Sequence, residues 1–176
     1  MGVECDSKKV GGVEAHVPRL ITSAARNYRD DVASEHFFHR ARVTNKVERV
    51  WEELQKPSTW KQIGGVDRIT DERFDKHGDL IGYRFTIFVA GTDYQGLATR
   101  TLAERRRLMV MGIDSPQLTG EIGVALSPNG ETTWIELSLA MASKGLLSAM
   151  LFPAVVKAVA GGFDATATEF VNSLSN

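Results

Sequence analysis

Residues 66–142 alternate between apolar-rich runs of about ten residues and short turn sequences, and this alternation constrains the fold more than any other feature. Gly, Pro, Asn and Asp, which are typical of turns, occur at 76–79, 91–93, 114–116 and 127–130, and the charged run 104–106 marks a further turn. Five short turns divide the segment into six strands. Because turns this short join antiparallel neighbours, the sequence predicts a meander of hairpins.

The strands of this segment carry their apolar side chains at every second position, which predicts a sheet with one buried face. Two of them show the alternation most clearly, and their same-face residues are Ile81, Tyr83, Phe85, Ile87 and Val89 in one strand and Thr133, Ile135, Leu137, Leu139 and Met141 in the last. Successive strand residues point to opposite faces, so Trp134 has the opposite parity to Ile135. In the last strand, either the set that contains Ile135 or the opposite set that contains Trp134 can face the core, but not both.

The last 34 residues contain only four charged side chains, Lys144, Lys157, Asp164 and Glu169. The spacing predicts a helix over 145–174, which Pro153 kinks or restarts. A membrane span over 145–163 is disfavoured, because Lys157 near a bilayer centre would cost about 2.5–3.5 kcal/mol. We expect a helix that protein covers on several sides.

Two short helices are predicted between a first strand at 35–43 and the meander. Thr44 or Asn45 is the expected cap of the first helix, whose apolar stripe is Val47, Val50, Trp51 and Leu54. Pro57 opens the second helix and Gly64 with Gly65 ends it. The predicted fold class is α+β: a seven-stranded curved antiparallel sheet wrapped around a long C-terminal helix, with a cavity where the helix does not fill the sheet.

Residues 1–34 are expected to form an N-terminal extension, and residues 35–176 a single domain, as 176 residues allow. Within the extension, Val17, Leu20, Ile21, Ala24, Tyr28 and Val32 have helical spacing on one face. The segment 17–32 is either a short helix packed on the domain or a docking helix for a protein partner. No apolar signal segment begins the chain, so we expect a cytoplasmic protein.

Two stretches of this sequence, one near each end of the expected domain, resemble a known superfamily. The first is Val43-Thr-Asn-Lys-Val-Glu-Arg-Val-Trp-Glu-Glu-Leu followed by Pro57-Ser-Thr-Trp60. The second is Gly145-Leu-Leu-Ser-Ala-Met-Leu-Phe-Pro-Ala-Val-Val with a helix end at Phe170-Val-Asn-Ser-Leu174. Both resemble the SRPBCC (START/polyketide cyclase-like, birch-pollen-allergen-like) superfamily, and the resemblance covers residues 35–174. The N-terminal extension departs from it, as does Thr44-Asn45, where many members have a small residue and a proline.

The resemblance implies a helix-grip fold that encloses a pocket for a hydrophobic molecule. Members of the superfamily include lipid and sterol carriers, quinone-binding chaperones, plant hormone receptors, polyketide aromatase/cyclases and ring-hydroxylating oxygenase domains. The fold does not choose among these activities.

Several kinds of chemistry have no support in the sequence. His36 and His39 point to opposite faces of one strand and cannot chelate a metal together, so no metal or other cofactor is expected. The single cysteine, Cys5, lies in the extension, and no nucleophile motif is present. The net charge is -1, and the one basic run, 105–107, lies on a predicted turn. The chain therefore lacks the overall positive potential that would attract nucleic acid.

Polar side chains inside the cavity would be required for a cyclase. His39, Tyr83, Tyr94 and Arg100 have the parity to point inward. The alternative reading is that the histidine and tyrosines are satisfied structural residues and that the arginine is solvent-exposed.

The sequence therefore predicts a binding module for a lipid, isoprenoid or polyketide-like molecule, without catalytic residues. The predicted walls are Tyr83, Phe85, Trp134, Met141, Phe152 and Val156, with Arg100 as polar anchor. One alternative is a polyketide aromatase/cyclase. Another is a toxin-like or ribosome-associated interaction protein, in which the outer surface and the segment 17–32 matter more than the cavity.

Overall fold

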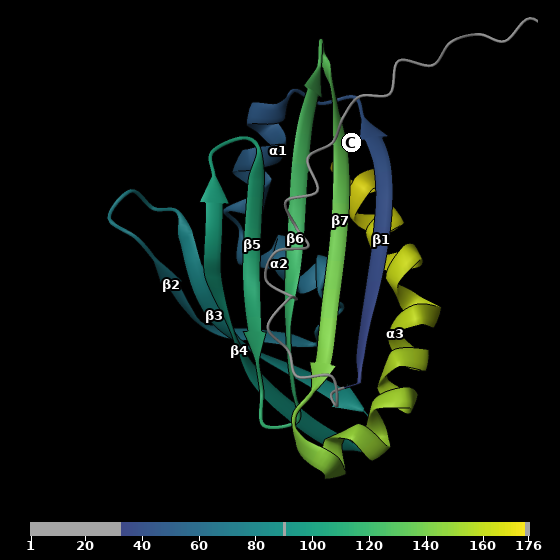
Figure 1. Cartoon of the computed structure of the whole chain (residues 1–176). Coiled ribbons are helices and arrows are strands. Elements are labelled where there is room, and N and C mark those ends of the chain that lie inside the picture. Colours follow the sequence, from purple (N-terminus) through teal and green to yellow (C-terminus); the bar gives the residue numbers. More distant parts are fainter. Residues whose placement is uncertain (1–32, 90, 175–176) are drawn as a thin grey trace, which may run out of the picture.

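The computed structural model describes residues 33–89 and 91–174, and in it one seven-stranded antiparallel sheet organises the chain. Its strands lie in the order β1-β7-β6-β5-β4-β3-β2 (Figure 1). Their bounds are β1 Ser34–Val43, β2 Arg68–Phe74, β3 Leu80–Val89, β4 Thr92–Glu104, β5 Leu108–Asp114, β6 Leu118–Asn129 and β7 Thr132–Ser143. Every strand from β2 to β7 pairs with its sequence neighbour, and β1 joins the edge of β7. The predicted meander is confirmed.

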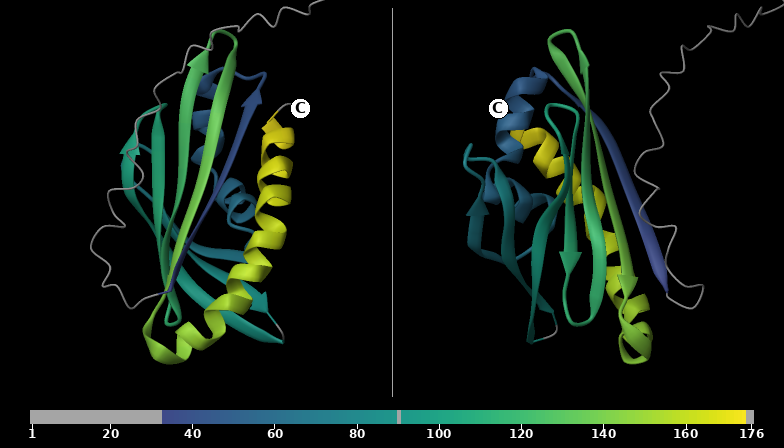
Figure 2. Two further views of the ribbon diagram at one scale, coloured as in Figure 1. Left: turned by 45° about the vertical axis from the view of Figure 1, so that its right-hand side comes forward. Right: turned by 60° about the vertical axis from the view of Figure 1, so that its left-hand side comes forward.

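Three helices accompany the sheet: α1 (Val47–Leu54), α2 (Pro57–Ile63) and α3 (Gly145–Leu174). The sheet curves, and α3 runs along its concave side next to β1, while α1 and α2 lie near the C-terminal end of α3 (Figure 2). This confirms the helix-grip arrangement of a curved sheet, a long C-terminal helix and two short helices after the first strand. In the described part of the chain, no helix combines the length and the apolar character needed to cross a membrane. The predicted helix at 17–32 lies outside the described residues.

The core fills the concave side of the sheet, as the alternation predicted. Ile135, Leu137, Leu139 and Met141 of β7 are buried there together with Tyr83 and Phe85 of β3. Trp60 of α2 is completely buried, and its indole Nε1 donates a hydrogen bond to the carbonyl of Leu54 at 2.7 Å. That carbonyl belongs to the last turn of α1, where no helical N–H remains to bind it, so the indole N–H joins the two helices.

The start of α1 differs from the prediction. The N-cap residue is Lys46, without a side-chain capping bond, rather than Thr44 or Asn45. Asn45 instead donates a side-chain hydrogen bond to the carbonyl of Leu174, and its own carbonyl accepts one from the Thr133 hydroxyl at 2.7 Å. Asn45 therefore ties the C-terminal end of α3 and strand β7 to the beginning of α1, which leaves it unavailable as a cap.

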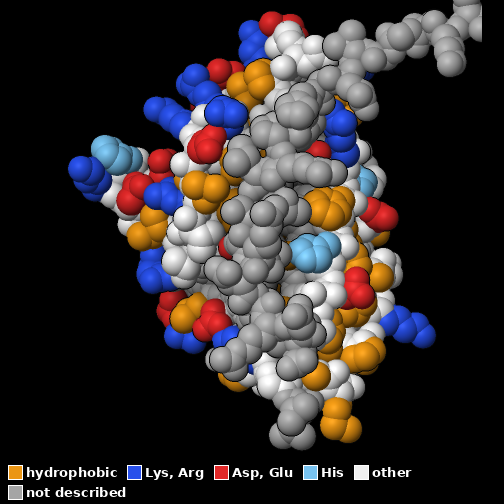
Figure 3. Space-filling model, viewed as in Figure 1, with side chains coloured by type: hydrophobic (Ala, Val, Ile, Leu, Met, Phe, Trp, Pro, Cys, Tyr) orange, Lys and Arg blue, Asp and Glu red, His pale blue; other side chains and the backbone are white. Residues whose placement is uncertain are grey.

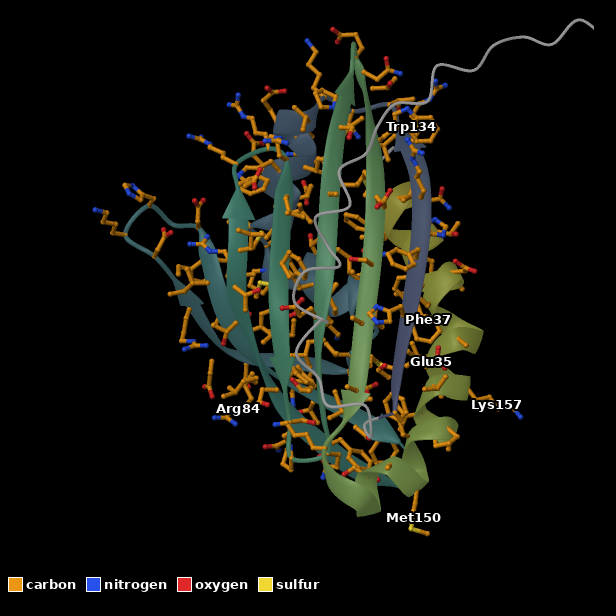
Figure 4. All side chains as sticks on the ribbon, viewed as in Figure 1. Glu35, Phe37, Arg84, Trp134, Met150 and Lys157 are labelled. Atoms are coloured by element: carbon orange, nitrogen blue, oxygen red, sulfur yellow. The ribbon has the colours of Figure 1, made fainter. Side chains whose placement is uncertain are left out.

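Helix α3 is less covered than predicted. Its buried side chains among the described residues are Phe152, Phe163, Ala167, Phe170, Val171 and Leu174, so its second half packs closely and its first half contributes one. Met150 is 79% exposed, and it and Lys157 project away from the sheet (Figure 4). Among the described side chains of its first half, the expectation that protein covers this helix on several sides is not met. The ribbon of α3 bends near Met150, close to Pro153, which lacks the N–H of a continuous helix.

Candidate ligand site

The concave face has a packed end and an end with smaller side chains, and the strand register shows both. One row across the sheet is Met109, Val124, Leu137 and His39, which lies toward the end where α1, α2 and the end of α3 converge. Two rows closer to the start of α3, the register joins Tyr83, Ala98, Ile113, Gly120, Met141 and Glu35. Small residues at Ala98 and Gly120 lie between the larger Tyr83 and Met141, and we call this the small-residue row.

The Tyr83 hydroxyl is the polar group that distinguishes this row. The residue is only 3% exposed, and its hydroxyl makes no hydrogen bond to the residues that the structure describes. Among those residues, every completely buried side-chain oxygen or nitrogen has a partner. The hydroxyl therefore keeps some accessible surface and borders a space that a water molecule or a ligand group can enter. Burial raises the pKa of Tyr83 well above its ordinary value, so the phenol stays protonated and can donate a hydrogen bond.

Phe85 occupies the next position of the same face toward the start of α3. It pairs with Gly96 of β4, and a Cβ atom placed on Gly96 would lie 2.3 Å from Cζ of the Phe85 ring. The Phe85 ring therefore lies directly over Gly96, and a side chain at position 96 would displace the ring. This fixes an aromatic wall beside Tyr83.

The first half of α3 starts at the same end of the sheet, since it follows β7 directly. Phe152 is buried in the core, and Val156 packs against the core while half-buried. Tyr83, Phe85, Met141, Phe152 and Val156, predicted as walls, therefore all belong to the concave side at this end. The half of the helix that has fewer buried side chains among the described residues lies at the end that carries the small-residue row.

Arg100 has the predicted inward parity, because it pairs with Met111 of the core. It is not free, however. Its Nη2 donates a hydrogen bond to Oδ2 of Asp75, in the β2–β3 turn, at 2.9 Å. The other oxygen of Asp75 accepts the backbone N–H groups of His77 and Asp79. The guanidinium and these N–H groups hold the pKa of Asp75 at about 2. Arg100 thus holds the β2–β3 turn against the edge of the sheet. To anchor a ligand, as the sequence led us to expect, Arg100 would have to break its bond to Asp75.

Trp134 is placed differently from the other predicted wall residues. Its strand neighbours Thr133 and Ile135 are completely buried on the concave side, so Trp134 points to the outer face, where the guanidinium of Arg40 lies 4.8 Å from its ring centroid (Figure 4). The strand period of two forces this separation. Trp134 is therefore removed from the walls of the interior.

His39 lies at the rim rather than inside. Its Nδ1 is 3.1 Å from Oδ1 of Asp164 of α3, whose side chain is 80% exposed. Phe37, two residues earlier, packs its ring against Phe163 of α3, with 5.8 Å between the centroids. The side chains of β1 thus hold the helix against the sheet edge. Among the described residues, no three His, Cys, Asp or Glu side chains converge as metal ligands would.

Sequence reasoning did not identify Ala98, Gly120 or Asp75 as site residues. The two small residues carried a signal, because each shares the parity of buried neighbours and so predicts a small side chain on the inner face. At Gly120 the backbone of β7 takes the space of a side chain, since a Cβ atom there would lie 2.3 Å from the carbonyl oxygen of Ala140. Asp75 carried a weaker one: it precedes the Lys-His-Gly-Asp turn, where aspartate often binds backbone N–H groups. Its pairing with Arg100, 25 residues away, has no sequence signal.

Solved structures of low sequence identity share this architecture. A START superfamily protein from Mycobacterium smegmatis aligns with a TM-score of 0.54 at 12% identity, over 79% of this chain and 98% of that one. The Zhui aromatase/cyclase from Streptomyces sp. R1128 aligns at 0.55 and 16%, over 78% and 94%. Norcoclaurine synthase from Thalictrum flavum aligns at 0.52 and 16%, over 83% and 97%. No protein-family model and no curated protein matches the sequence.

These three proteins include a cyclase and a synthase, so the shared architecture spans different activities. The alignments cover nearly all of each solved chain, and the part of this chain that they leave out is about as long as the N-terminal extension. The chain therefore shares the helix-grip fold of these proteins, and its sequence predicted that fold.

Proposed function

We propose that the protein binds a hydrophobic small molecule with one polar group at the small-residue row, under the first half of α3, and that it carries this molecule without transforming it. The observation that carries the proposal is the Tyr83 hydroxyl, which is protonated, unpartnered among the described residues and surrounded by apolar core. An apolar surface with a single hydrogen-bond donor suits a lipid, isoprenoid or polyketide-like ligand.

The apolar walls supply the affinity in this proposal. Burial of apolar ligand surface contributes about 25 cal/mol per Å² before the entropic costs of binding. Met111 and Met141 lie in the core on this side of the sheet, and methionine adapts its shape to different ligands. The Tyr83 donor then orients the polar end of the ligand, and Phe85 with Phe152 flanks its apolar part.

The polar side chains of the interior favour binding over catalysis. General acid–base catalysis works best with a group whose pKa lies near the operating pH. Tyr83 is held protonated and Arg100 is occupied by Asp75, so neither offers such a group. An aromatase/cyclase is the second candidate, since a solved aromatase/cyclase shares the fold and the Tyr83 hydroxyl can also donate a hydrogen bond to a bound polyketide.

Further features of the proposal concern the whole chain. Residues 35–176 act as one binding domain in the cytoplasm, and Trp134, on the outer face, has no part in the site. In the alternative case of an interaction protein of the toxin-like or ribosome-associated type, the segment 17–32 is the candidate for contact with a protein partner.

Native mass spectrometry of the freshly purified full chain, followed by organic extraction, tests the proposal. We expect a discrete added mass that extraction removes, and its chemistry identifies the ligand class. A chain that stays at its apo mass, and that remains unshifted across a panel of lipids, quinones and polyketides, would contradict binding. A bound polyketide recovered with a changed mass would favour the cyclase.

The Tyr83→Phe variant examines the role of the hydroxyl, because it removes one oxygen and keeps the ring. We expect the affinity for the extracted ligand to fall about tenfold, as the loss of one hydrogen bond implies. Trp134→Phe is the matched control on the outer face and should leave the affinity unchanged. Equal affinities of Tyr83→Phe and the unaltered chain would mean that the hydroxyl does not contact the ligand.

A further inference from the structure

The outer face of the sheet carries a groove of about 470 Å³, on the opposite side from α3. Its floor is made by outward residues of β5, β6 and β7, the three strands between β1 and β4. Four of these residues are small: Gly112 of β5, Gly123 of β6, and Ser138 and Ala140 of β7. Strands β1 and β4 border it with larger side chains. Small residues between larger ones make the depression, and we call it the outer groove.

The borders of the outer groove are apolar. Phe38 of β1 is 56% exposed, and Leu97 and Leu102 of β4 are 41% and 44% exposed. The first two line the groove itself, and hydrophobic side chains appear on this face in Figure 3. Large exposed apolar side chains along a depression mark an interaction surface.

One carboxylate lies on the floor between these borders. Glu121 of β6 sits between Gly112 and Ala140 in the strand register, and it is half-buried. Within the described residues it forms no ion pair, whereas the nearby Asp114 is paired with Lys144. Burial raises the pKa of Glu121, as expected for a carboxylate that lacks a compensating cation. A partner of this groove should therefore combine apolar side chains with a positive charge.

The segment 17–32 of the same chain has this combination. Its helical stripe includes Val17, Leu20, Ile21, Ala24 and Tyr28, and Arg19, Arg26 and Arg29 lie away from the stripe. The described chain begins at residue 33, and Ser34 and His36 already line the groove, so the segment is attached at its edge. A short tether gives an effective concentration in the millimolar range, which neither a free protein nor a second copy has.

The dimensions also agree. A helix of 16 residues is about 24 Å long and 10–12 Å wide. The four strand spacings between β1 and β4 span about 19 Å, and a 12-residue strand such as β6 is about 40 Å long. The groove can thus take one helix along the strands between its two borders.

We propose that residues 17–32 dock as an amphipathic helix in the outer groove, with their apolar stripe between Phe38 and Leu97 and with Arg29, which flanks the stripe, reaching Glu121. The chain thereby covers the apolar outer face of its own sheet. The ligand site on the concave side remains separate, because the sheet lies between the two.

Hydrogen–deuterium exchange of the full chain tests this docking. We expect the amides of residues 17–32 to exchange at least tenfold slower than in an unstructured peptide. The variant Ala140→Trp fills the groove and should abolish this protection, whereas Ala158→Trp, on the exposed side of α3, should leave it intact. Exchange at peptide rates in the unaltered chain, or full protection in Ala140→Trp, would overturn the proposal.

A variant of the segment itself covers the case in which Ala140→Trp does not fold. Leu20→Asp places a charge in the apolar stripe, so we expect residues 17–32 to lose protection while the amides of β5–β7 keep theirs. Unchanged protection of the segment would contradict docking through the stripe. Protection that appears only at high protein concentration would assign the groove to a second copy and overturn the intramolecular contact.

A spin label locates the segment. In a Cys5→Ser chain, a nitroxide attached through Ser23→Cys should broaden the amide signals of Gly112, Gly123 and Ala140 more than that of Phe170 of α3, because the effect falls steeply with distance. Equal broadening on both sides of the sheet, or none at the groove, would show that the segment lies elsewhere.

Discussion

Arg100 of β4 binds Asp75 of the β2–β3 turn through a 2.9 Å hydrogen bond between Nη2 and Oδ2. The same carboxylate accepts the backbone N–H groups of His77 and Asp79, so one side chain shapes the turn and holds it against the sheet. The residue that sequence parity suggested as a ligand anchor therefore has a partner from its own chain. Its contribution is to the structure of this sheet edge.

This pair predicts a pH dependence of stability. The pKa of Asp75 is about 2 in the folded chain, against an ordinary value of 3.8. The stabilisation is therefore complete above about pH 4 and is lost as the pH falls toward 2, when the carboxylate takes up a proton. Urea denaturation at pH 5, 4, 3 and 2 should show a steeper loss of unfolding free energy for the unaltered chain than for Asp75→Asn. Parallel pH profiles for the two chains would contradict the role of the pair.

A larger side chain in place of Ala98 would show whether the interior at this row is open or filled. The variant Ala98→Leu adds three carbon atoms at the small-residue row, between Tyr83 and Ile113. If the row borders ligand space, as we propose, the added side chain occupies that space, so ligand binding is lost while the unfolding free energy stays within about 0.5 kcal/mol. Overpacking of a filled core would instead cost about 1–3 kcal/mol. Chemical denaturation together with native mass spectrometry of the two chains decides between them.

Two glycines should respond in opposite directions to the same substitution. Gly96→Ala places a methyl group where the Phe85 ring lies, 2.3 Å from Cζ, and we expect a loss of about 1–3 kcal/mol in unfolding free energy. Gly161→Ala lies on the exposed side of α3 with no atom within 4 Å of its new Cβ, so we expect a gain of about 0.5–1 kcal/mol. Thermal unfolding measures both. A neutral Gly96→Ala would mean that the Phe85 ring moves aside freely.

Trp60 predicts a cost for losing one buried hydrogen bond. Trp60→Phe removes the Nε1 donor and leaves the Leu54 carbonyl without its partner, which costs about 1–3 kcal/mol beyond the loss of ring volume. Trp51→Phe is the matched control, because Trp51 is also buried but its indole makes no hydrogen bond to the described residues. Urea denaturation should therefore show the larger loss for Trp60→Phe. Equal losses would indicate that only volume matters at both positions.

The sequence by itself determined the elements of this protein and their order. Strand alternation, turn residues and helical spacing are local properties. They predicted six hairpin-linked strands, two short helices of which the second ends at Gly64 and Gly65, and a helix over 145–174. The same alternation separated Trp134 from Ile135. The burial of the Ile135 set in the core then excluded Trp134 from the interior.

Only the tertiary structure decided which polar groups stay free. Arg100 and Tyr83 have the same inward parity, but Asp75, from a distant turn, binds the first and no described residue binds the second. Asn45 does not cap α1, because its side chain binds the carbonyl of Leu174 at the end of α3 instead. Such pairings depend on how a curved sheet and a bent helix bring residues that are remote in sequence close together in space. Local sequence patterns do not contain this information.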